Sequence, residues 1–417
     1  MPDTLPQTSS PRGDAPRVIP LEGGLLRSRL RQEQFWQAFG QGWTGPLTTL
    51  AALARGRQAL RDHLDRHATL DPATLPYDPD VVADLGRPDA PVTLSAKYPE
   101  GIARQIADHH GIATIIEGKA APQATPRKRD VLRALRPHQW LKNLLVFLPM
   151  LAAHQLDAAT FAAALLAFVS FCLVASSVYV LNDLLDLAAD RAHPRKCNRP
   201  FASGAVPLSY GSVLAPALLI AGGAVAAPLG PAFIAVLAIY YGATMLYSFS
   251  LKRHMVIDIC MLAGLYIMRM IAGSTATQIP LSVWLLAFAL FIFLSLAAVK
   301  RQAELVDAAR RGALASSGRG YQVADLPIIS MIALCSGYVS VLVMALYVNS
   351  PNVVELYAQP AALWAVCAVL LYWITRTVLL THRGQMHDDP VVFALRDRIS
   401  QICFAVIAGC VLIGALV

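Results

Sequence analysis

The sequence predicts an all-α membrane protein of nine transmembrane helices, preceded by a small α/β domain that we call the head. The 417 residues are 56% hydrophobic and only 15% charged, whereas globular domains carry about 25% charged residues. Mean hydropathy is +0.49. The apolar residues gather after about residue 140, in runs long enough to cross a bilayer. These observations exclude an ordinary globular enzyme.

The predicted head covers residues 16–119, between a polar tail at 1–15 and a linker at 120–130. Residues 16–36 have the pattern of an apolar strand, a glycine turn and a helix, and residues 92–112 that of a second strand and helix. No basic segment followed by an apolar run opens the sequence, so we expect no cleaved signal peptide and a cytoplasmic head.

Runs of roughly 20 apolar residues mark the expected spans in a membrane domain at 131–417. They lie near residues 140–156, 160–181, 210–228, 231–250, 255–273, 280–299, 327–348, 361–381 and 399–417.

Basic residues fall on one side of these spans. The segments before the first span and after spans two, four, six and eight contain Lys and Arg, and the other four connections contain none. The positive-inside rule then places the N-terminus in the cytoplasm and the C-terminus outside an inner (plasma) membrane. A basic cytoplasmic face suits lipid or substrate phosphates, so the net charge of +8 requires no nucleic-acid partner. The sequence also allows a homo-oligomer.

The densest polar cluster follows the second span, in NDLLDLAADRAHPRKCNRP at 182–200. On one helix its carboxylates and amide fall within roughly a 100° arc. They are Asn182, Asp183, Asp186 and Asp190. Mg²⁺ prefers hard oxygen ligands and binds through one or two carboxylates plus substrate phosphates, so the face predicts a diphosphate held through bridging metal. Lys196 and Arg199 follow and can contact phosphate oxygens. The alternative is a salt-bridge network at a helix end.

A second polar set lies on the fifth span. Asp258, Tyr266 and Arg269 share a helix face within roughly 80°. The set suits a polyol phosphate, although the Asp and Arg could instead pair with each other or with backbone.

Further cations lie where helices are expected to meet the lipid headgroups. They are Lys142, Lys252, Lys300, Arg301 and Arg398. Such residues either bind a lipid phosphate or anchor the helices, and both interpretations stay open.

The motif NDxxDxxxDxxHPxKxxRP resembles the first aspartate-rich motif of the UbiA superfamily of intramembrane prenyltransferases, and the resemblance covers about residues 130–417. It implies nine helices around a central cavity and a Mg²⁺-dependent condensation of a diphosphate substrate with an acceptor. Ordinary members carry a second motif, usually DxxxD. Here Leu262 stands four residues after Asp258, so that second pair of carboxylates is missing.

Other stretches are similar to the decaprenyl-phosphate phosphoribosyltransferase branch of that superfamily. They are LRPHQWLKN at 135–143, YSFSLK before Asp258, the Tyr266 and Arg269 pair, VKRQAEL at 299–305, RGY at 319–321 and DPVVFALRDR at 389–398. This similarity implies transfer of 5-phosphoribose from phosphoribosyl diphosphate to a polyprenyl phosphate, with release of diphosphate.

The resemblance also implies roles. The Mg²⁺ ligands would be Asp183, Asp186 and Asp190. Lys196 and Arg199 would neutralise the leaving group, and Asp258 would orient ribose hydroxyls, while Tyr266 and Arg269 would face the sugar or its 5-phosphate.

A polyprenyl phosphate is already an anionic nucleophile, so the reaction needs no general base, and position and electrostatics suffice. We therefore expect His193 to make a phosphate contact or a structural hydrogen bond. Two alternatives remain: a prenyltransferase that moves an isoprenoid from its diphosphate to an aromatic or other acceptor, and a transporter or lipid-binding protein. The charges gather at one face and no inverted repeat is evident, which opposes the last class.

The head resembles the haloacid-dehalogenase-like domain that precedes some UbiA-type proteins and opens on DxDGT. The corresponding positions here hold Pro20, Glu22 and Gly24, and Ser95 stands at the second motif. Proline cannot form an aspartyl-phosphate, so phosphatase chemistry by that route is excluded. We expect a degenerate domain with a docking or regulatory role.

Overall fold

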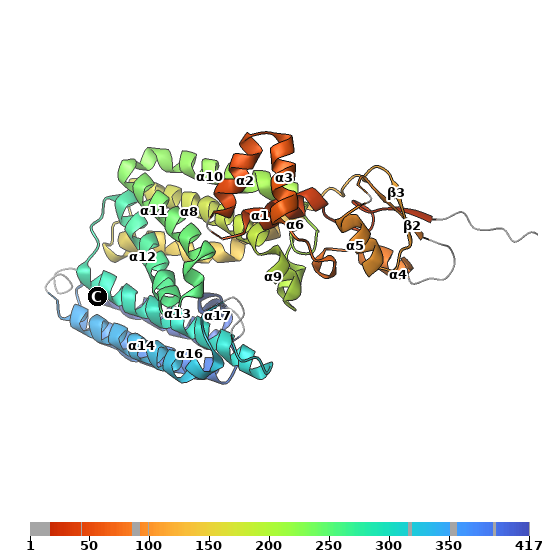
Figure 1. Ribbon diagram of the computed structural model, residues 1–417. Helices are drawn as coiled ribbons and strands as arrows, with labels where there is room; N and C mark the ends of the chain where they lie inside the picture. The colour runs from red at the N-terminus through yellow and green to blue at the C-terminus, as the bar shows by residue number, and fades with distance from the viewer. Residues whose placement is uncertain are drawn as a thin grey trace, which may run out of the picture. The chain divides into compact units, whose positions relative to one another are not determined.

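The structure is a computed structural model. It describes residues 17–42, 44–85, 92–98, 100–315, 319–350, 357–386 and 389–416. The tail expected at 1–15 lies outside the described residues. The chain forms two compact units, with elements labelled in Figure 1. The head unit combines Met1–Leu135 with Tyr179–Ala215, and the membrane unit combines Arg136–Val178 with Pro216–Val417.

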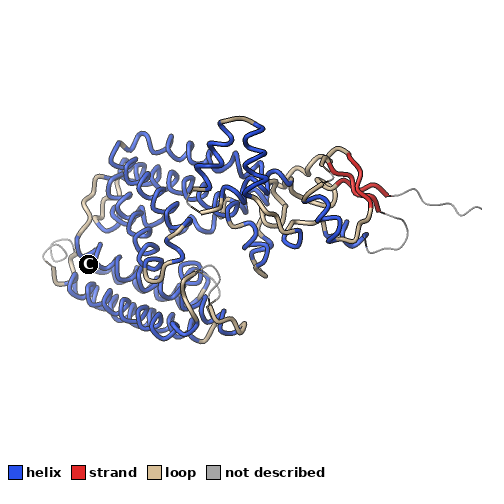
Figure 2. The backbone as a smooth tube through the Cα atoms, in the orientation of Figure 1, coloured by secondary structure: helices blue, strands red, loops and turns tan. Residues whose placement is uncertain are grey.

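The head unit contains a three-stranded parallel sheet in the order β1-β2-β3, which Figure 2 sets apart from the helices. The strands are β1 Arg17–Pro20, β2 Val92–Ala96 and β3 Thr114–Glu117. Leu94, which is completely buried, pairs with Ile19 on one side and Ile115 on the other. The small α/β region expected ahead of the membrane helices is confirmed, and its likeness to a haloacid-dehalogenase domain stays a prediction.

Short helices complete the head. They are α1 Leu30–Phe39, α2 Gly45–Ala54, α3 Arg57–His67, η1 Pro72–Thr74, α4 Pro79–Leu85, α5 Ile102–His109 and α6 Lys128–Ala134. Glu22 has a structural role here, because its Oε1 accepts the Leu30 N–H at 2.9 Å. That contact satisfies one of the N–H groups that the first turn of a helix leaves without an intrahelical partner.

Eight helices in the described residues are long and apolar enough to cross a membrane. They are α8 Ala158–Leu185, α10 Leu208–Ala226, α11 Pro231–Phe249, α12 Ile257–Thr277, α13 Val283–Arg310, α14 Leu326–Val348, α16 Leu363–His382 and α18 Arg398–Leu416. Apolar runs become helices because a helix pairs its backbone N–H and C=O groups within its own segment, as lipid requires. The multi-pass membrane architecture is thereby confirmed.

The first expected span, near 140–156, differs from the other eight. It forms the 3₁₀ helix η2 Pro137–Phe147 followed by the short helix α7 Leu148–Ala152. Arg136, the residue before Pro137, takes a left-handed conformation (φ 52°) and so stands between α6 and η2. Pro149 lacks an N–H and so cannot extend a regular helix from η2.

Glycine sets how closely η2 approaches α12. A Cβ at Gly273 would lie 2.0 Å from the carbonyl oxygen of Val146, so only a residue without a side chain allows this packing. The contact places Lys142 and Asn143 of η2 beside α12.

Short segments connect the long helices. They are α9 Leu187–Ala192, η3 Lys196–Asn198, η4 Ala227–Leu229, η5 Leu251–Arg253, η6 Val323–Asp325, η7 Pro360–Ala362 and α17 Pro390–Arg396. Several of them carry the polar residues that the sequence singles out.

Candidate active site

The aspartate-rich segment of the head unit forms two helices that nearly continue one another. Asp186 stands between α8 and α9, with φ −98° and ψ 16°. Its N–H donates to the Asn182 carbonyl at 2.9 Å, and the Asp190 N–H donates to the Asp186 carbonyl at 2.8 Å. These i to i−4 bonds keep the three residues one turn apart, as the sequence predicts.

Two of the predicted metal ligands share one cation. Arg199 Nη1 donates to Asp183 Oδ1 at 3.1 Å and to Asp190 Oδ2 at 2.5 Å, and both aspartates are 2% exposed. Burial raises the pKa of Asp190, and the Arg199 guanidinium opposes this only in part. Lys196, exposed in η3, adds a further positive charge near Asp190. The carboxylates and cations of the motif therefore lie together, with Arg199 bound to carboxylates here.

The donor set fits a divalent cation chemically. Its atoms are carboxylate and amide oxygens, which Mg²⁺ prefers, and Asn182 Oδ1 is buried without a hydrogen-bond partner in the described part of the chain. The Arg199 guanidinium lies where Asp183 and Asp190 converge, so a positive charge already balances them. Among the described residues, no three His, Cys, Asp or Glu side chains are close enough to hold a metal ion, and Asp186 does not complete the triad in this arrangement.

His193 makes a structural hydrogen bond. Its Nδ1 accepts the backbone N–H of Arg195 at 3.2 Å and that of Lys196 at 3.4 Å. The ring thus supports the loop that presents the motif's cations.

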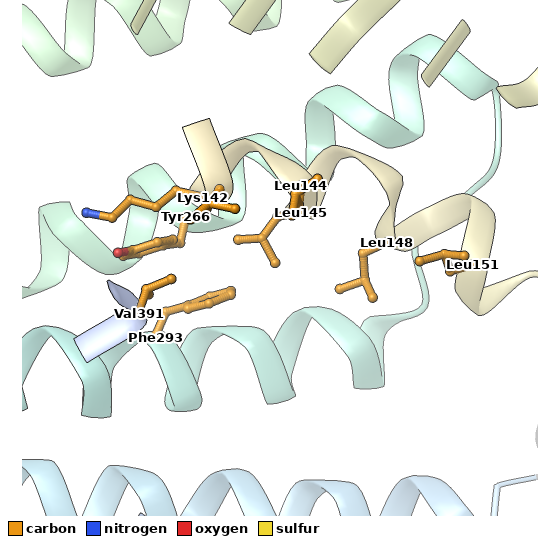
Figure 3. Close-up of a pocket in the computed structure, with 9 residues that line it drawn as sticks. Lys142, Leu144, Leu145, Leu148, Leu151, Tyr266, Phe293 and Val391 are labelled. Carbon is orange, nitrogen blue, oxygen red and sulfur yellow. The ribbon is translucent and has the colours of Figure 1, made fainter. Parts of the chain in front are cut away.

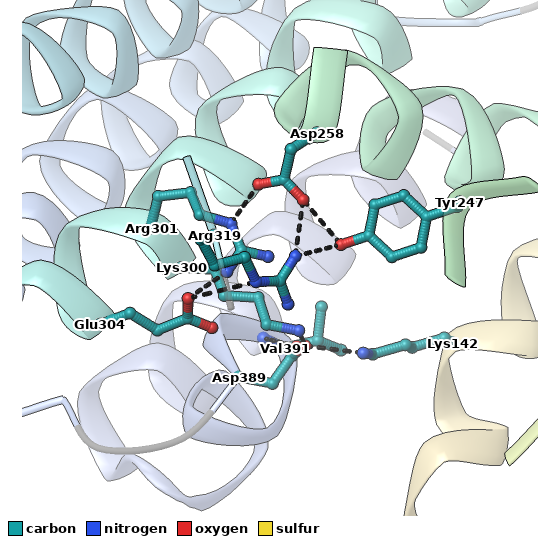
Figure 4. A network of polar contacts seen from close by, with 9 residues as sticks. All are labelled: Lys142, Tyr247, Asp258, Lys300, Arg301, Glu304, Arg319, Asp389 and Val391. Carbon is teal, nitrogen blue, oxygen red and sulfur yellow. Dashed lines mark hydrogen bonds and ion pairs between the residues drawn. The ribbon is translucent and has the colours of Figure 1, made fainter. Parts of the chain in front are cut away.

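Asp258 lies at the centre of an ionic network in the membrane unit (Figure 4). It stands in the first turn of α12 and is 0% exposed. Arg301 Nε lies 2.5 Å from Asp258 Oδ2, and Arg319 Nη1 lies 2.7 Å from Oδ1. The Tyr247 hydroxyl donates to the same Oδ1 at 2.7 Å. Glu304 binds Arg301 and lies 3.9 Å from Arg319 Nε. One carboxylate therefore meets two guanidinium groups and a phenol.

Two lysines meet a single carboxylate in the same view (Figure 4). Asp389 Oδ2 lies 2.7 Å from Lys142 Nζ and 3.3 Å from Lys300 Nζ. Burial raises the pKa of Asp389, but the Lys300 and Lys142 ammonium groups outweigh it and hold that pKa well below its ordinary value. Asp389 is thus a carboxylate across the physiological pH range.

Arg269 belongs to a different set of contacts from Asp258. Its Nε donates to Asn143 Oδ1 at 2.8 Å, its Nη1 to the Leu265 carbonyl at 2.5 Å and its Nη2 to the Tyr240 hydroxyl at 2.8 Å. The guanidinium carbon also lies 5.6 Å from the centre of the Tyr266 ring. The shared face predicted for Asp258, Tyr266 and Arg269 therefore divides, and Arg269 joins η2, α11 and α12 through neutral acceptors.

An apolar groove begins beside Lys142 (Figure 3). It encloses about 190 Å³ and is lined by Leu141, Lys142, Leu144, Leu145, Leu148, Leu151, Tyr266, Phe293 and Val391. The Tyr266 and Phe293 rings stack at 4.7 Å between centroids. The groove therefore has leucines along its length and an ammonium group among its lining residues.

Sequence reasoning assigned no role to four members of the networks around Asp258 and Asp389, namely Tyr247, Glu304, Arg319 and Asp389. Each lies in one of the stretches YSFSLK, VKRQAEL, RGY and DPVVFALRDR, so the signal that could have found them was their presence in those motifs. Lys252 stands in η5 between α11 and α12.

Known proteins resemble this chain over most of the membrane helices. The profile of the UbiA prenyltransferase family matches residues 143–396. Nodulation protein NoeC of Azorhizobium caulinodans is 39% identical over 270 residues, which are 65% of this chain and 88% of that protein. The decaprenyl-phosphate phosphoribosyltransferase of Mycolicibacterium smegmatis is 37% identical over 302 residues, which are 70% of this chain and 95% of that protein. Part of this chain thus lies beyond what it shares with that transferase.

Among solved structures, a UbiA homologue from Archaeoglobus fulgidus bound to GPP and Mg²⁺ covers 67% of this chain and 99% of its own, with a TM-score of 0.52 and 16% identity. At that identity the likeness concerns the fold alone.

Proposed function

The chain belongs to the UbiA prenyltransferase family, and we propose that it is a Mg²⁺-dependent transferase of the plasma membrane that moves 5-phosphoribose from phosphoribosyl diphosphate to a polyprenyl phosphate. The bond between ribose C1 and the diphosphate oxygen breaks, and its electron pair leaves on diphosphate. A phosphate oxygen of the lipid forms the new bond to C1. That oxygen is already anionic, so no residue has to remove a proton.

The observation that carries this proposal is the surroundings of Asp258. Where ordinary prenyl-transferring members have a second carboxylate, this chain has Leu262, and Asp258 is bound by Arg301 and Arg319. Guanidinium groups donate paired hydrogen bonds to phosphate oxygens. The network around Asp258 contains two guanidinium groups, two carboxylates and a phenol, and such a set of hydrogen-bonding groups suits a phosphorylated sugar better than a bare isoprenoid.

The groove beside Lys142 supports a polyprenyl phosphate as the acceptor. Leu145, Leu148 and Phe293 offer apolar surface to an isoprenoid chain, and Lys142 with Lys300 offers two ammonium groups to its phosphate. The relative from Mycolicibacterium smegmatis is named a decaprenyl-phosphate phosphoribosyltransferase, and decaprenyl phosphate is a polyprenyl phosphate.

Asp183, Asp186 and Asp190 would hold Mg²⁺, with Asn182 as a further oxygen donor. When bound, the metal would offset the negative charge of the departing diphosphate. Arg199 balances Asp183 and Asp190 in this structure, and its guanidinium would be available to the diphosphate oxygens when those carboxylates hold the metal. Lys196 would add charge from the exposed side of the same loop.

The test is a transfer assay with purified protein in lipid nanodiscs. Ribose-labelled phosphoribosyl diphosphate, decaprenyl phosphate and Mg²⁺ should place label in the organic-extractable fraction, and EDTA should abolish it. No labelled lipid from protein that stays monodisperse would contradict the proposal. Transfer from an isoprenoid diphosphate to an aromatic acceptor under the same conditions would identify the prenyltransferase alternative.

A further inference from the structure

A buried ion pair connects the first helix of the head to the aspartate-rich segment. Arg191 of α9 binds Glu33 of α1 through two parallel contacts, Nη2 to Oε1 at 2.7 Å and Nη1 to Oε2 at 3.0 Å. The side chains are 9% and 2% exposed. Such a two-point contact fixes the orientation of both planar groups as well as their distance.

The same guanidinium reaches a third segment. Arg191 Nε donates to the Ala202 carbonyl at 3.0 Å, in the turn where the Ser203 N–H and hydroxyl both bind the Arg199 carbonyl at 2.9 Å. Glu33 therefore holds Arg191, Arg191 holds the turn, and the turn presents Arg199, whose guanidinium binds the motif's carboxylates.

Other contacts place α1 beside the helices on either side of the motif, α8 and α10. Trp36 Nε1 donates to Ser212 Oγ in α10 at 3.2 Å, and a Cβ at Gly40 would lie 3.5 Å from the Leu185 carbonyl oxygen at the end of α8. The other ion pair of α1, Arg31 with Asp65, has exposures of 41% and 55%. The contrast matters because exposed pairs contribute little to structure, whereas a buried pair is disrupted when either partner is removed.

From these contacts we infer that the head is a working part of the transferase: α1 fixes the position of the aspartate-rich segment on which metal and diphosphate binding depends, with Glu33 as a positioning residue acting through Arg191. Glu33 touches no substrate. This inference rests on the proposed function, and it explains why a head unable to do phosphatase chemistry is packed onto the motif.

The test compares Glu33→Gln with Asp65→Asn, each of which removes one carboxylate charge of an α1 ion pair, one buried and one exposed. Mn²⁺ binding is titrated by electron paramagnetic resonance in the presence of inorganic diphosphate, and transfer kinetics are measured on the same preparations. Glu33→Gln should weaken Mn²⁺ binding and raise the KM for phosphoribosyl diphosphate at least tenfold, with the KM for polyprenyl phosphate unchanged. Asp65→Asn should match the wild type.

Arg191→Lys keeps the positive charge but loses the two-point contact, and it serves as a second variant if Glu33→Gln does not fold. It should show the same split between the two KM values, and the exchange Glu33→Arg with Arg191→Glu should restore part of the Mn²⁺ affinity. Wild-type Mn²⁺ affinity and KM values in folded Glu33→Gln or Arg191→Lys protein would overturn the inference. A wild-type protein that neither binds Mn²⁺ nor transfers ribose would instead refute the proposed function.

Discussion

Arg301 and Asp258 form an ion pair of 2.5 Å between Nε and Oδ2, with side chains 1% and 0% exposed. The pair joins the start of α12 to the middle of α13. Two charges removed from water are stable only while they remain together, because either one alone is buried without compensation.

Removing the carboxylate of this pair should therefore destabilise the protein. We expect Asp258→Ala to lower the free energy of unfolding by about 3 kcal/mol, the order found when one partner of a buried pair is lost, because Arg301 and Arg319 each lose a buried carboxylate partner and keep Glu304. Thermal unfolding in detergent measures the change. Asp307→Ala is the control, since it breaks an exposed pair with Arg311 on the same helix. An equal loss in both variants would contradict the prediction.

Substitution within the aspartate-rich segment should act on turnover and leave the fold intact. Asp186→Asn keeps the size and the backbone bonds of its residue but removes a metal-binding charge, so we expect transfer to fall below detection at unchanged melting temperature. Asp157→Asn, at the exposed start of α8, should keep full activity. Wild-type turnover by Asp186→Asn would remove the metal assignment.

Hydropathy and motif spacing predict much of this structure, and particular residues show which features they do not predict. The long helices follow from apolar runs, and the one-turn steps from Asn182 to Asp186 and from Asp186 to Asp190 follow from the sequence separation. The 3₁₀ form of η2 is not among the predicted features, because its run is predicted as a regular span although it contains Lys142 and Asn143 and is interrupted by Pro149. The hydropathy of this run does not reveal that its backbone departs from a regular α-helix.

The partners of the predicted site residues were also beyond local sequence. Arg269 binds Asn143, which is 126 positions away, and Arg319 reaches Asp258 across 61 positions. Spacing along one helix predicts which side chains share a face, but it does not predict which other helix that face meets. The pairing of Arg199 with Asp183 lies between these cases, because both residues stand in one motif whose loop had to fold back.

Loss of Asp389 should destabilise the protein with a defined pH dependence. The folded-state pKa of this carboxyl is lowered, so its contribution is fully present above the unfolded value of about 4 and is lost as pH falls through the folded value. We expect Asp389→Asn to lower the melting temperature by a constant amount from pH 8 to pH 5. The difference from wild type should shrink only in more acidic solution. A gap that closes near pH 6 would contradict this.

Filling the groove should impair acceptor binding selectively. Leu148→Trp places a larger ring among the lining side chains, and we expect it to raise the KM for a long polyprenyl phosphate at least tenfold, with the KM for phosphoribosyl diphosphate unchanged. Leu371→Trp, on an exposed face of α16, is the matched control. Equal effects on both substrates would show that the groove does not hold the acceptor.

The distribution of basic residues predicts the orientation of the chain. With Lys and Arg confined to one set of connections, we expect an alkaline phosphatase fused to the C-terminus to be active outside the cell and a fluorescent protein fused to the N-terminus to be bright inside it. Fusions expressed in bacterial cells report the side of the membrane on which each terminus lies. An inactive C-terminal phosphatase in a stably expressed protein would mean that the number of crossings is even.

Asp389 makes anion binding beside the groove an exchange reaction. Lys142 and Lys300 already hold an anion that is tethered to the protein, so an incoming group must displace it. Chloride or a simple carboxylate carries no more charge than Asp389, so replacing Asp389 beside the two lysines would gain it little binding free energy. A phosphate dianion brings twice that charge, so under the proposed function the cluster would favour phosphorylated lipids over monovalent anions, and the tethered carboxylate would return to the lysines when the phosphate leaves.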